Sequence, residues 1–248
     1  MEQQGAPLLE LDQVVFGYAG SSGEARRIFE RASFVLHWGE RIGLHAPNGA
    51  GKSTLFRLLT GLEKPAAGRI LFHGKSVQTA QDWLYLRQRV GLVFQHAEDQ
   101  LFCPTVLEDV AFGPLNLGLS PEEAQHRAEE TLHKLGLESF ANRPTYRLSG
   151  GEKRLVALSS VLSMRPEALL LDEPTTGLDA VSRRKLLTLL EEMPVGGIFV
   201  SHDWNFLSEV CTAFITIMDK RIVEITKNTE HTHHHAHPLG FYIHSHDM

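Results

Sequence analysis

A glycine-rich turn between two apolar segments constrains this chain more than any other feature. The turn is residues 46–54, APNGAGKST; an apolar run ends just before it, and residues 52–61 repeat apolar side chains at helical spacing. A strand that enters a helix through such a turn leaves consecutive backbone N–H groups pointing into the turn. Together with the positive end of the helix, these groups favour a bound phosphate. The sequence therefore predicts a phosphate-binding loop of the Walker A type in an α/β fold.

Each polar group of this loop has an expected role. Lys52 would reach the β- and γ-phosphates of a nucleoside triphosphate, and the Ser53 hydroxyl would bind Mg²⁺. Ala46 replaces the first glycine of the usual pattern; we favour a strand-end conformation there, because a positive φ would cost about 1 kcal/mol or more. The alternative is a glycine-rich turn with a solvated lysine. The residues expected to contact the nucleotide are Asn48, Gly49, Ala50, Gly51, Lys52, Ser53 and Thr54.

Four further polar residues end apolar runs that are typical of buried parallel strands. Asp172 and Glu173 end ALLLDE, Gln95 ends VGLVFQ, and His202 ends GIFVSH. The carboxyl ends of parallel strands meet at one edge of a sheet, so we expect the four side chains in one crevice. Asp172 would join Ser53 around Mg²⁺, and the Gln95 amide would contact either Mg²⁺ or the attacking water as a catalytic group. Glu173 would act as general base on a water, and His202 would donate to the γ-phosphate. The alternative for the two carboxylates is an acidic loop.

Charge and apolar patterning exclude several classes of protein. Among 248 residues, 24 Lys+Arg against 30 Asp+Glu give a net charge of −6, whereas a nonspecific nucleic-acid binder needs clustered basic residues. No run of about 18 apolar residues occurs, and the N-terminal residues lack the layout of a secretory signal. Two cysteines cannot form a disulfide framework, which is typical of a reducing cytoplasm. We expect no nucleic-acid partner and no direct membrane insertion.

The remaining patterns predict how the chain is divided. Helix (149–164), strand (168–172), helix (180–192) and strand (197–201) alternate as parallel βαβ units do. Helix formers dominate residues 96–165, where Ser120, Pro121 and Glu123 predict a helix start with a capping box. We therefore expect one domain over residues 8–226 with a helical subdomain at about 96–165, and a tail, residues 227–248, without fixed structure.

The order of the motifs carries a resemblance to a known family. Along the chain come the phosphate loop, Gln95, the segment LSGGE (148–152), the strand with Asp172 and Glu173, the segment GLD (177–179), and His202. This order resembles the ATPase subunit of an ATP-binding cassette transporter, and the match runs from about residue 8 to 226. The resemblance implies an ATP-binding cassette fold, with a RecA-like parallel-sheet core, an antiparallel β subdomain and a helical signature subdomain. It also implies ATP hydrolysis with Mg²⁺.

The resemblance further implies a shared site. The segment LSGGE (148–152) matches the family's signature segment. In the family, the signature completes the partner subunit's site, so two copies would sandwich two ATP molecules in an ATP-dependent head-to-tail homodimer. By the same resemblance Tyr18 stacks on adenine, with packing against the core as the alternative. The residues implied to meet the nucleotide of the partner copy are Ser149, Gly150, Gly151, Glu152 and Asp179.

Residues 94–120 resemble the energy-coupling-factor ATPases, in particular those of cobalt and nickel uptake systems, through the pattern FQ-x-x-x-DQLF. This implies the ATPase of an importer, peripheral on the cytoplasmic face of the cell membrane and bound to integral membrane subunits. Apolar residues such as Leu101, Phe102, Phe112 and Leu115 predict that residues 95–119 dock such a subunit. The alternatives are an importer of another small nutrient such as a vitamin, a soluble cassette ATPase not tied to transport, and a metal-storage protein.

The C-terminal segment is rich in histidine. Neutral imidazole is a common ligand of Ni²⁺, Co²⁺ and Zn²⁺, so the tail predicts metal binding, and we expect Ni²⁺ or Co²⁺. A purification tag and a solvated tail with incidental metal affinity are the alternatives. The candidate ligands are His231, His233, His234, His235, His237, His244 and His246.

Overall fold

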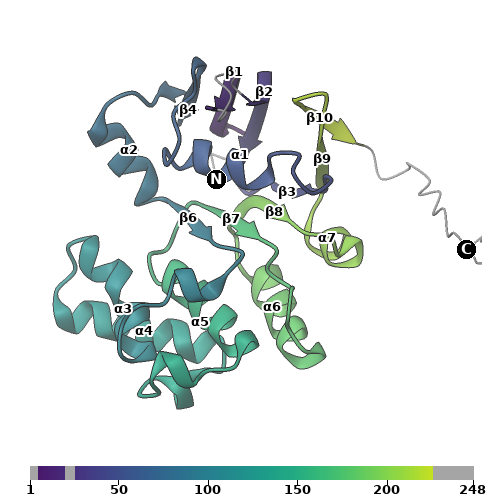
Figure 1. The fold of residues 1–248 in the computed structure, drawn as a ribbon. Helices are drawn as coiled ribbons and strands as arrows, with labels where there is room; N and C mark the ends of the chain where they lie inside the picture. The colour runs from purple at the N-terminus through teal and green to yellow at the C-terminus, as the bar shows by residue number, and fades with distance from the viewer. Residues whose placement is uncertain (1–4, 20–25, 226–248) are drawn as a thin grey trace, which may run out of the picture.

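The described part of the chain, residues 5–19 and 26–225 of a computed structural model, forms two β-sheets and a group of helices (Figure 1). The first sheet is antiparallel, has the order β2-β1-β4-β5 and lies at the top of Figure 1. In β2, buried and exposed side chains alternate after the first few residues, as expected of a sheet with one face on the core. The strands are β1 (Pro7–Tyr18), β2 (Arg26–His37), β4 (Ala67–Phe72) and β5 (Lys75–Ser76).

The second sheet has the order β10-β9-β3-β8-β7-β6. Its strands run parallel from β9 to β6, and β10 pairs antiparallel with β9. Every residue of β7 and β8 is buried, which explains why their sequences are nearly continuous apolar runs. The strands are β3 (Arg41–Leu44), β6 (Val90–Val93), β7 (Ala168–Asp172), β8 (Gly196–Val200), β9 (Ala213–Met218) and β10 (Arg221–Ile225).

The helices complete two hydrophobic cores that meet at the parallel sheet. Ala168 and Leu170 of β7 enter the core shared with the antiparallel sheet, whereas Leu169 and Leu171 enter the core shared with the helices below the sheet in Figure 1. The α-helices are α1 (Lys52–Leu59), α2 (Ala80–Arg87), α3 (Val106–Asn116), α4 (Pro121–Lys134), α5 (Gly150–Leu162), α6 (Ala180–Glu192) and α7 (Trp204–Val210). Short 3-10 helices lie at η1 (Ala97–Asp99), η2 (Glu138–Phe140) and η3 (Thr145–Arg147).

Much of the predicted architecture is confirmed. The fold is α/β, with a parallel core sheet, a separate antiparallel sheet and a helical part built from α3, α4 and α5. The strand at 168–172 and the helix at 180–192 have the predicted bounds. α4 begins with the predicted capping box, because Glu123 N donates to Ser120 Oγ at 3.2 Å and Ser120 N donates to Glu123 Oε2 at 3.0 Å.

Several predicted boundaries are wrong by one or two residues. The strand predicted to end at Gln95 ends at Val93, because Phe94 N donates to Gln100 Oε1 at 3.2 Å. The helix predicted over 149–164 is Gly150–Leu162, with Ser149 as its N-cap, and the strand predicted over 197–201 is Gly196–Val200. Gln95 and His202 therefore each lie two residues beyond a strand rather than at its end.

Some predictions fall on residues that the structure does not describe. The seven histidines predicted to bind metal lie outside the described residues, so that hypothesis stays a prediction. The domain bounds 8–226 and 227–248 also stay predictions. Within the described ranges, no helix is both long enough and apolar enough to span a membrane.

Candidate active site

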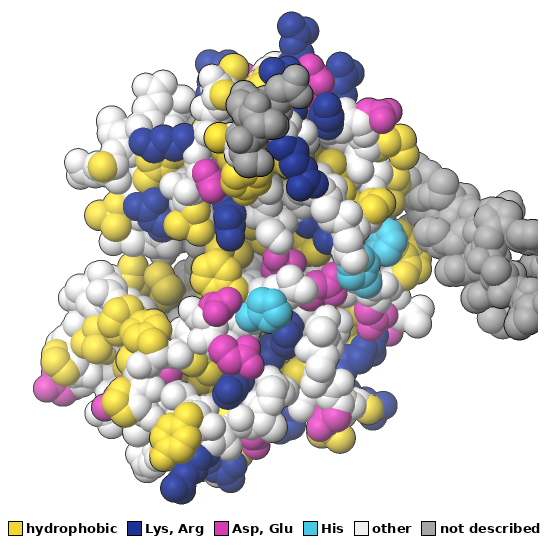
Figure 2. Space-filling model, viewed as in Figure 1, with side chains coloured by type: hydrophobic (Ala, Val, Ile, Leu, Met, Phe, Trp, Pro, Cys, Tyr) yellow, Lys and Arg dark blue, Asp and Glu magenta, His cyan; other side chains and the backbone are white. Residues whose placement is uncertain are grey.

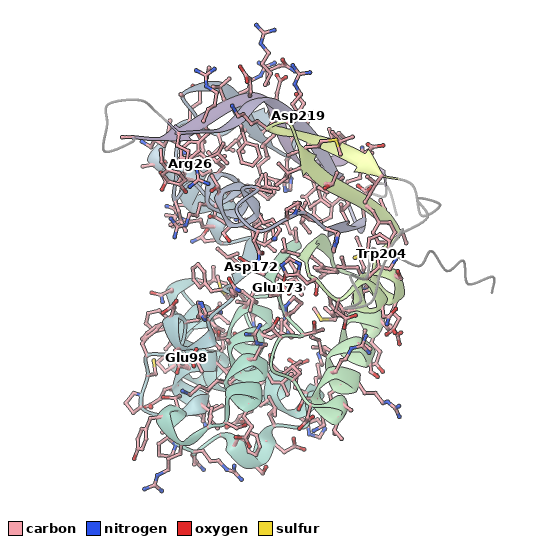
Figure 3. The ribbon with its side chains drawn as sticks, turned by 45° about the vertical axis from the view of Figure 1, so that its right-hand side comes forward. Arg26, Glu98, Asp172, Glu173, Trp204 and Asp219 are labelled. Carbon is pink, nitrogen blue, oxygen red and sulfur yellow. The ribbon has the colours of Figure 1, made fainter. Side chains whose placement is uncertain are left out.

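The register of the parallel sheet aligns the strand ends that carry the site. Leu44 and Asp172 both pair with Val200, and Val93 pairs with Leu171, so β3, β7, β8 and β6 end almost level. A cavity of about 340 Å³ opens at this edge. Figure 3 shows Asp172 and Glu173 between the β-rich part and the helical part. The cavity is lined by Tyr18, Arg26, Ile28, Asn48, Gly49, Gly51, Lys52, Ser53, Thr54, Gln95, Asp172, Glu173 and His202.

The loop between β3 and α1 has an open helix N-terminus. α1 begins without a side-chain cap and without an acidic residue in its first turn, so its first N–H groups can bind an anion. Gly49 and Gly51 have φ of 77° and 112°, and a Cβ on Gly51 would lie 2.6 Å from Ile28 Cγ2. Ala46 is absent from the described residues with positive φ. The expected tolerance of alanine at that position is therefore confirmed.

Lys52 lies folded against its own loop. Its Nζ donates to the carbonyl oxygens of Ala46 at 2.7 Å and Pro47 at 3.3 Å. Burial lowers the pKa of Lys52 from its ordinary value, and the nearby Glu173 and Asp172 oppose that effect. The ammonium thus faces both carboxylates from the loop that would hold the phosphates.

Asp172 and Ser53 form a contact suited to a divalent cation. Ser53 Oγ donates to Asp172 Oδ2 at 3.1 Å. Burial raises the pKa of Asp172, and repulsion from Glu173 adds to this, whereas Ser53, Lys52 and Arg154 oppose it. Gln95 lines the same cavity. A carboxylate, a hydroxyl and an amide are oxygen ligands of the kind that Mg²⁺ prefers, so these residues fit a magnesium site.

One carboxylate oxygen of Glu173 accepts hydrogen bonds, and the other accepts none among the described residues. The residue is 6% exposed, and its Oε2 accepts from His202 N at 3.3 Å and from the hydroxyls of Ser201 and Thr176 at 3.4 Å. Its Oε1 is buried and has no hydrogen-bond partner among the described residues. An oriented carboxylate with a free oxygen can accept a proton from a water.

His202 bridges the two sides of the cavity. Its Nε2 lies 3.1 Å from Asn48 Oδ1, where it donates, and 3.6 Å from Glu173 Oε1. The imidazole therefore links the phosphate loop to the carboxylate at the end of β7. Histidine and acidic side chains gather at the boundary between the upper and lower parts of the molecule in Figure 2.

Tyr18 lies at the mouth of the phosphate loop. Its hydroxyl is 3.3 Å from Thr54 Oγ1, and its ring packs edge-on against Phe16 with centroids 5.0 Å apart. The ring is half-buried and also lines the cavity. This position is compatible with both roles considered from the sequence, stacking on a base and packing against the core.

The signature residues and Asp179 do not line this cavity, and neither does Ala50. Ser149 caps α5, accepting from Glu152 N at 3.3 Å, while Glu152 Oε2 accepts from Ser149 N at 2.7 Å. Asp179 caps α6, accepting from Ser182 N at 2.7 Å. Ser149 and Gly150 are exposed. The structure thus brings the phosphate loop together with the strand-end residues and leaves the signature helix start on the surface.

Sequence reasoning missed three residues around the site. Arg26 and Ile28 of β2 line the cavity, and no local pattern marks them. Arg26 is labelled in Figure 3. Arg154 of α5 donates to the carbonyl oxygens of Gln95 and Glu173. A signal for Arg154 exists, because it lies four and seven residues before the buried Leu158 and Val161, on the apolar face of its helix.

Comparison with known proteins agrees with this geometry. The family model described as ABC transporter matches residues 29–176. A protein described as an ABC transporter ATP-binding protein of Nitratidesulfovibrio vulgaris is 50% identical over 242 residues, covering 98% of this chain and 87% of the relative. The chain therefore belongs to the ABC transporter family, and it is an ATP-binding, ATP-hydrolysing cassette of that family.

Two further relatives have more specific names. The energy-coupling factor transporter ATP-binding protein EcfA of Methanothermobacter thermautotrophicus is 45% identical over 206 residues, covering 82% of this chain and 65% of the relative. The cobalt import ATP-binding protein CbiO of Rhodobacter capsulatus is 45% identical over 201 residues, covering 79% of this chain and 70% of the relative. The predicted resemblance to energy-coupling-factor ATPases is confirmed.

Solved structures share the fold of the chain at lower sequence identity. The structure of cbiO1 from Clostridium perfringens, part of the ABC transporter complex cbiONQ, has a TM-score of 0.77 at 33% identity, covering 88% of this chain and 87% of that one. A dimeric ATP-binding cassette bound to ADP and Pi has a TM-score of 0.80 at 26% identity, covering 88% of this chain and 98% of that chain. The predicted cassette fold is confirmed.

The raised pKa of Asp172 predicts a stability effect. A carboxyl that binds its proton more tightly in the folded state stabilises the fold at low pH, and this contribution is lost as pH rises above the unfolded value of about 3.9 and through the folded pKa. Asp172→Asn keeps an acceptor for Ser53 but carries no charge. We expect it to raise the free energy of unfolding at neutral pH, without nucleotide or Mg²⁺, by about 0.5–2 kcal/mol.

Urea unfolding of both proteins between acid and neutral pH measures this effect. The exposed Asp219 lies in the β9–β10 turn with φ of 47°, a conformation that asparagine also adopts, so Asp219→Asn serves as the matched control. A less stable Asp172→Asn at neutral pH would contradict the prediction.

Proposed function

We propose that this chain is the ATP-hydrolysing subunit of a membrane importer for cobalt or nickel ions. One observation carries the proposed chemistry: the phosphate loop, Asp172, Glu173 and His202 meet in one cavity at the end of the parallel sheet. The names of the CbiO and EcfA relatives support an importer of the energy-coupling-factor kind. The CbiO name favours cobalt, and nickel rests on the sequence resemblance alone.

The residues of the cavity suggest how hydrolysis proceeds. The N–H groups at the start of α1 and the Lys52 ammonium would bind the phosphates. Ser53, Asp172 and Gln95 would hold Mg²⁺, which supplies charge neutralisation on the phosphates when bound. Glu173 Oε1 would take a proton from the attacking water, while Oε2 stays held by its three donors. His202 Nε2, now on Asn48, is placed to donate to a γ-phosphate.

A second copy of the chain would complete each site. Ser149 and Gly150 form the exposed start of α5, and neither lines the nucleotide cavity of the same chain. The N-terminus of a helix favours an anion, so this one could meet the phosphate of a nucleotide bound to another copy. Asp179 is likewise exposed and outside the cavity. The dimeric solved cassette supports a homodimer. The family resemblance implies that the signature of one copy faces the phosphate loop of the other. We expect this head-to-tail dimer to form with ATP.

An exposed apolar patch beside the site would dock a membrane subunit. Phe102 is 64% exposed and packs edge-on against Phe112, with ring centroids 4.7 Å apart, and Leu115 and Phe94 are also exposed. Figure 2 shows hydrophobic side chains gathered over the region of α3. Leu101 is instead partly buried against the helical core, so it is a poorer docking residue than the sequence suggested. Because Phe94 precedes Gln95, a partner on this patch would act on the site. The chain would then lie on the cytoplasmic face of the membrane.

The role of Glu173 predicts a separation of binding from turnover. Glu173→Gln should lower the steady-state rate of Mg²⁺-dependent ATP hydrolysis by about 10²–10⁴ while nucleotide affinity stays near wild type. Lys52→Ala should instead weaken nucleotide binding, since it removes the phosphate-facing charge. Enzyme assays and equilibrium binding of a fluorescent ATP analogue measure the two effects. Near-normal turnover by Glu173→Gln would contradict the proposed base.

A site built from two copies of the chain predicts that two inactive variants can restore each other's ATPase activity. Ser149→Arg and Lys52→Ala subunits should each be inactive alone, but a heterodimer of the two contains one site with both halves native. Mixing them should restore part of the ATPase activity, measured after heterodimers are confirmed by differential tagging. If confirmed heterodimers remain as inactive as either parent, each site is complete within one chain.

The docking patch predicts uncoupling. Phe102→Asp should abolish Co²⁺ or Ni²⁺ uptake by cells that carry the membrane subunits, while the isolated chain keeps its ATPase activity. Val223→Asp on β10, also at an exposed apolar residue, is the control and should leave uptake unchanged. Normal uptake with Phe102→Asp would exclude the docking patch. Uptake of neither ion by the wild-type system would contradict the proposed substrates.

A further inference from the structure

Arg154 joins the signature helix to two neighbouring strand ends. It lies on α5, and its Nη2 donates to the carbonyl oxygen of Gln95 at 2.7 Å while its Nη1 donates to the carbonyl oxygen of Glu173. These carbonyls follow β6 and β7, which pair with each other. One side chain therefore connects three segments that are separate in the sequence.

The chemistry of this contact is specific to arginine. The guanidinium is planar and presents several N–H donors in a fixed fork, so it can hold two carbonyl oxygens at once. Arg154 is half-buried, and within the described residues it forms no ion pair with a carboxylate. Burial lowers the pKa of Arg154, and the charges of Glu173, Glu98 and Asp172 oppose that effect. The charged guanidinium therefore donates to backbone oxygens at the edge of the cavity.

The backbone of Glu173 needs this support. Its φ is 51°, in the left-handed region that non-glycine residues seldom adopt. On one side its N–H donates to Val200 O at 2.9 Å, and on the other its carbonyl accepts from Arg154 and, at 3.2 Å, from Thr176 N. These bonds fix the peptide groups around Glu173, and thereby the direction in which its carboxylate enters the cavity.

The loop after β6 is tied to the same helix a second time. Gln100 Nε2 donates to Ala157 O of α5 at 2.9 Å, and Gln100 Oε1 accepts from Phe94 N at 3.2 Å. Together with Arg154, these bonds make the loop and α5 one connected unit. A displacement of the loop that holds Gln95 is therefore passed to α5 and, through Arg154, to the backbone of Glu173.

We propose that Arg154 is a positioning residue of the ATPase reaction. It couples the loop that holds Gln95 to the carboxylate of Glu173 by binding the carbonyl oxygens of Gln95 and Glu173. This proposal rests on the function proposed for Glu173. Because Arg154 touches backbone rather than nucleotide, it governs the chemical step and leaves nucleotide affinity to the phosphate loop.

Substitution with lysine separates charge from geometry. Lys keeps the positive charge but lacks the fork, so Arg154→Lys should lower kcat about tenfold or more, while KM and the affinity for an ATP analogue change less than about threefold. Arg154→Gln, which loses the charge as well, is the second variant. The control is Arg165→Lys, just beyond the C-cap of α5, where the arginine makes an exposed ion pair with Glu130 Oε2 at 3.1 Å. Its kcat should stay within about twofold of wild type.

A double-variant cycle excludes a merely structural role. If Arg154 acts through Glu173, Arg154→Lys should slow turnover strongly in the wild-type background and hardly at all in Glu173→Gln, measured in single-turnover assays. A general loss of structure would lower the rate by the same factor in both backgrounds. Unfolding midpoints and analogue binding of both arginine variants report directly on folding.

The outcomes distinguish this proposal from the proposed function. Loss of turnover by Glu173→Gln with near-normal kcat for both Arg154 variants would overturn the positioning role alone. Equal factors in the two backgrounds would overturn it as well. Near-normal turnover by Glu173→Gln, seen without any change at Arg154, would overturn the role of Glu173 and with it the role of Arg154.

Discussion

The hydrogen-bond register of the parallel sheet is the constraint on which the site depends. Leu44 and Asp172 face Val200 from opposite sides of β8, so the phosphate loop and the two carboxylates leave the sheet at the same level. Side chains alternate along a strand, so a shift of β7 by one residue would move each of its side chains from one hydrophobic core to the other. Ala168 and Leu170 would then enter the helical core, and Leu169 and Leu171 the β-rich one. The two cores therefore select the register that places Asp172 beside Ser53.

Sequence predicted those parts of the fold that local patterns determine. The buried strand 168–172, the helix 180–192, the capping box at Ser120 and the phosphate loop all follow from periodicity, caps and glycine positions. Contacts between distant segments were not predictable in this way. Arg154 binds carbonyls that lie 19 and 59 residues away, and the extra residues between each strand end and Gln95 or His202 depend on side-chain bonds in their loops. Arg26 enters the cavity only because β2 packs beside the loop.

The site gathers groups that oppose folding in the absence of ligand. Asp172 and Glu173 are adjacent and buried, Glu173 has a left-handed backbone, and one of its oxygens lacks a hydrogen-bond partner within the described part of the chain. The positive charges of Lys52 and Arg154 offset part of the repulsion between the carboxylates. Such unfavourable features gather where function requires them, and well-packed structure elsewhere offsets them. Here the offset lies in β7 and β8, whose residues are all buried.

The start of α1 differs from every other α-helix start in the described residues. α2, α3, α4 and α5 begin with capping boxes, and α6 and α7 with capping aspartates, whereas α1 has no side-chain cap. A bound phosphate would accept hydrogen bonds from the first N–H groups of α1, as a capping side chain does in the other helices. Without it, the first turn of α1 lacks the side-chain cap that the other described α-helix starts have, which favours fraying and amide hydrogen exchange there. Every cycle of ATP binding and release would then also build and loosen one turn of helix.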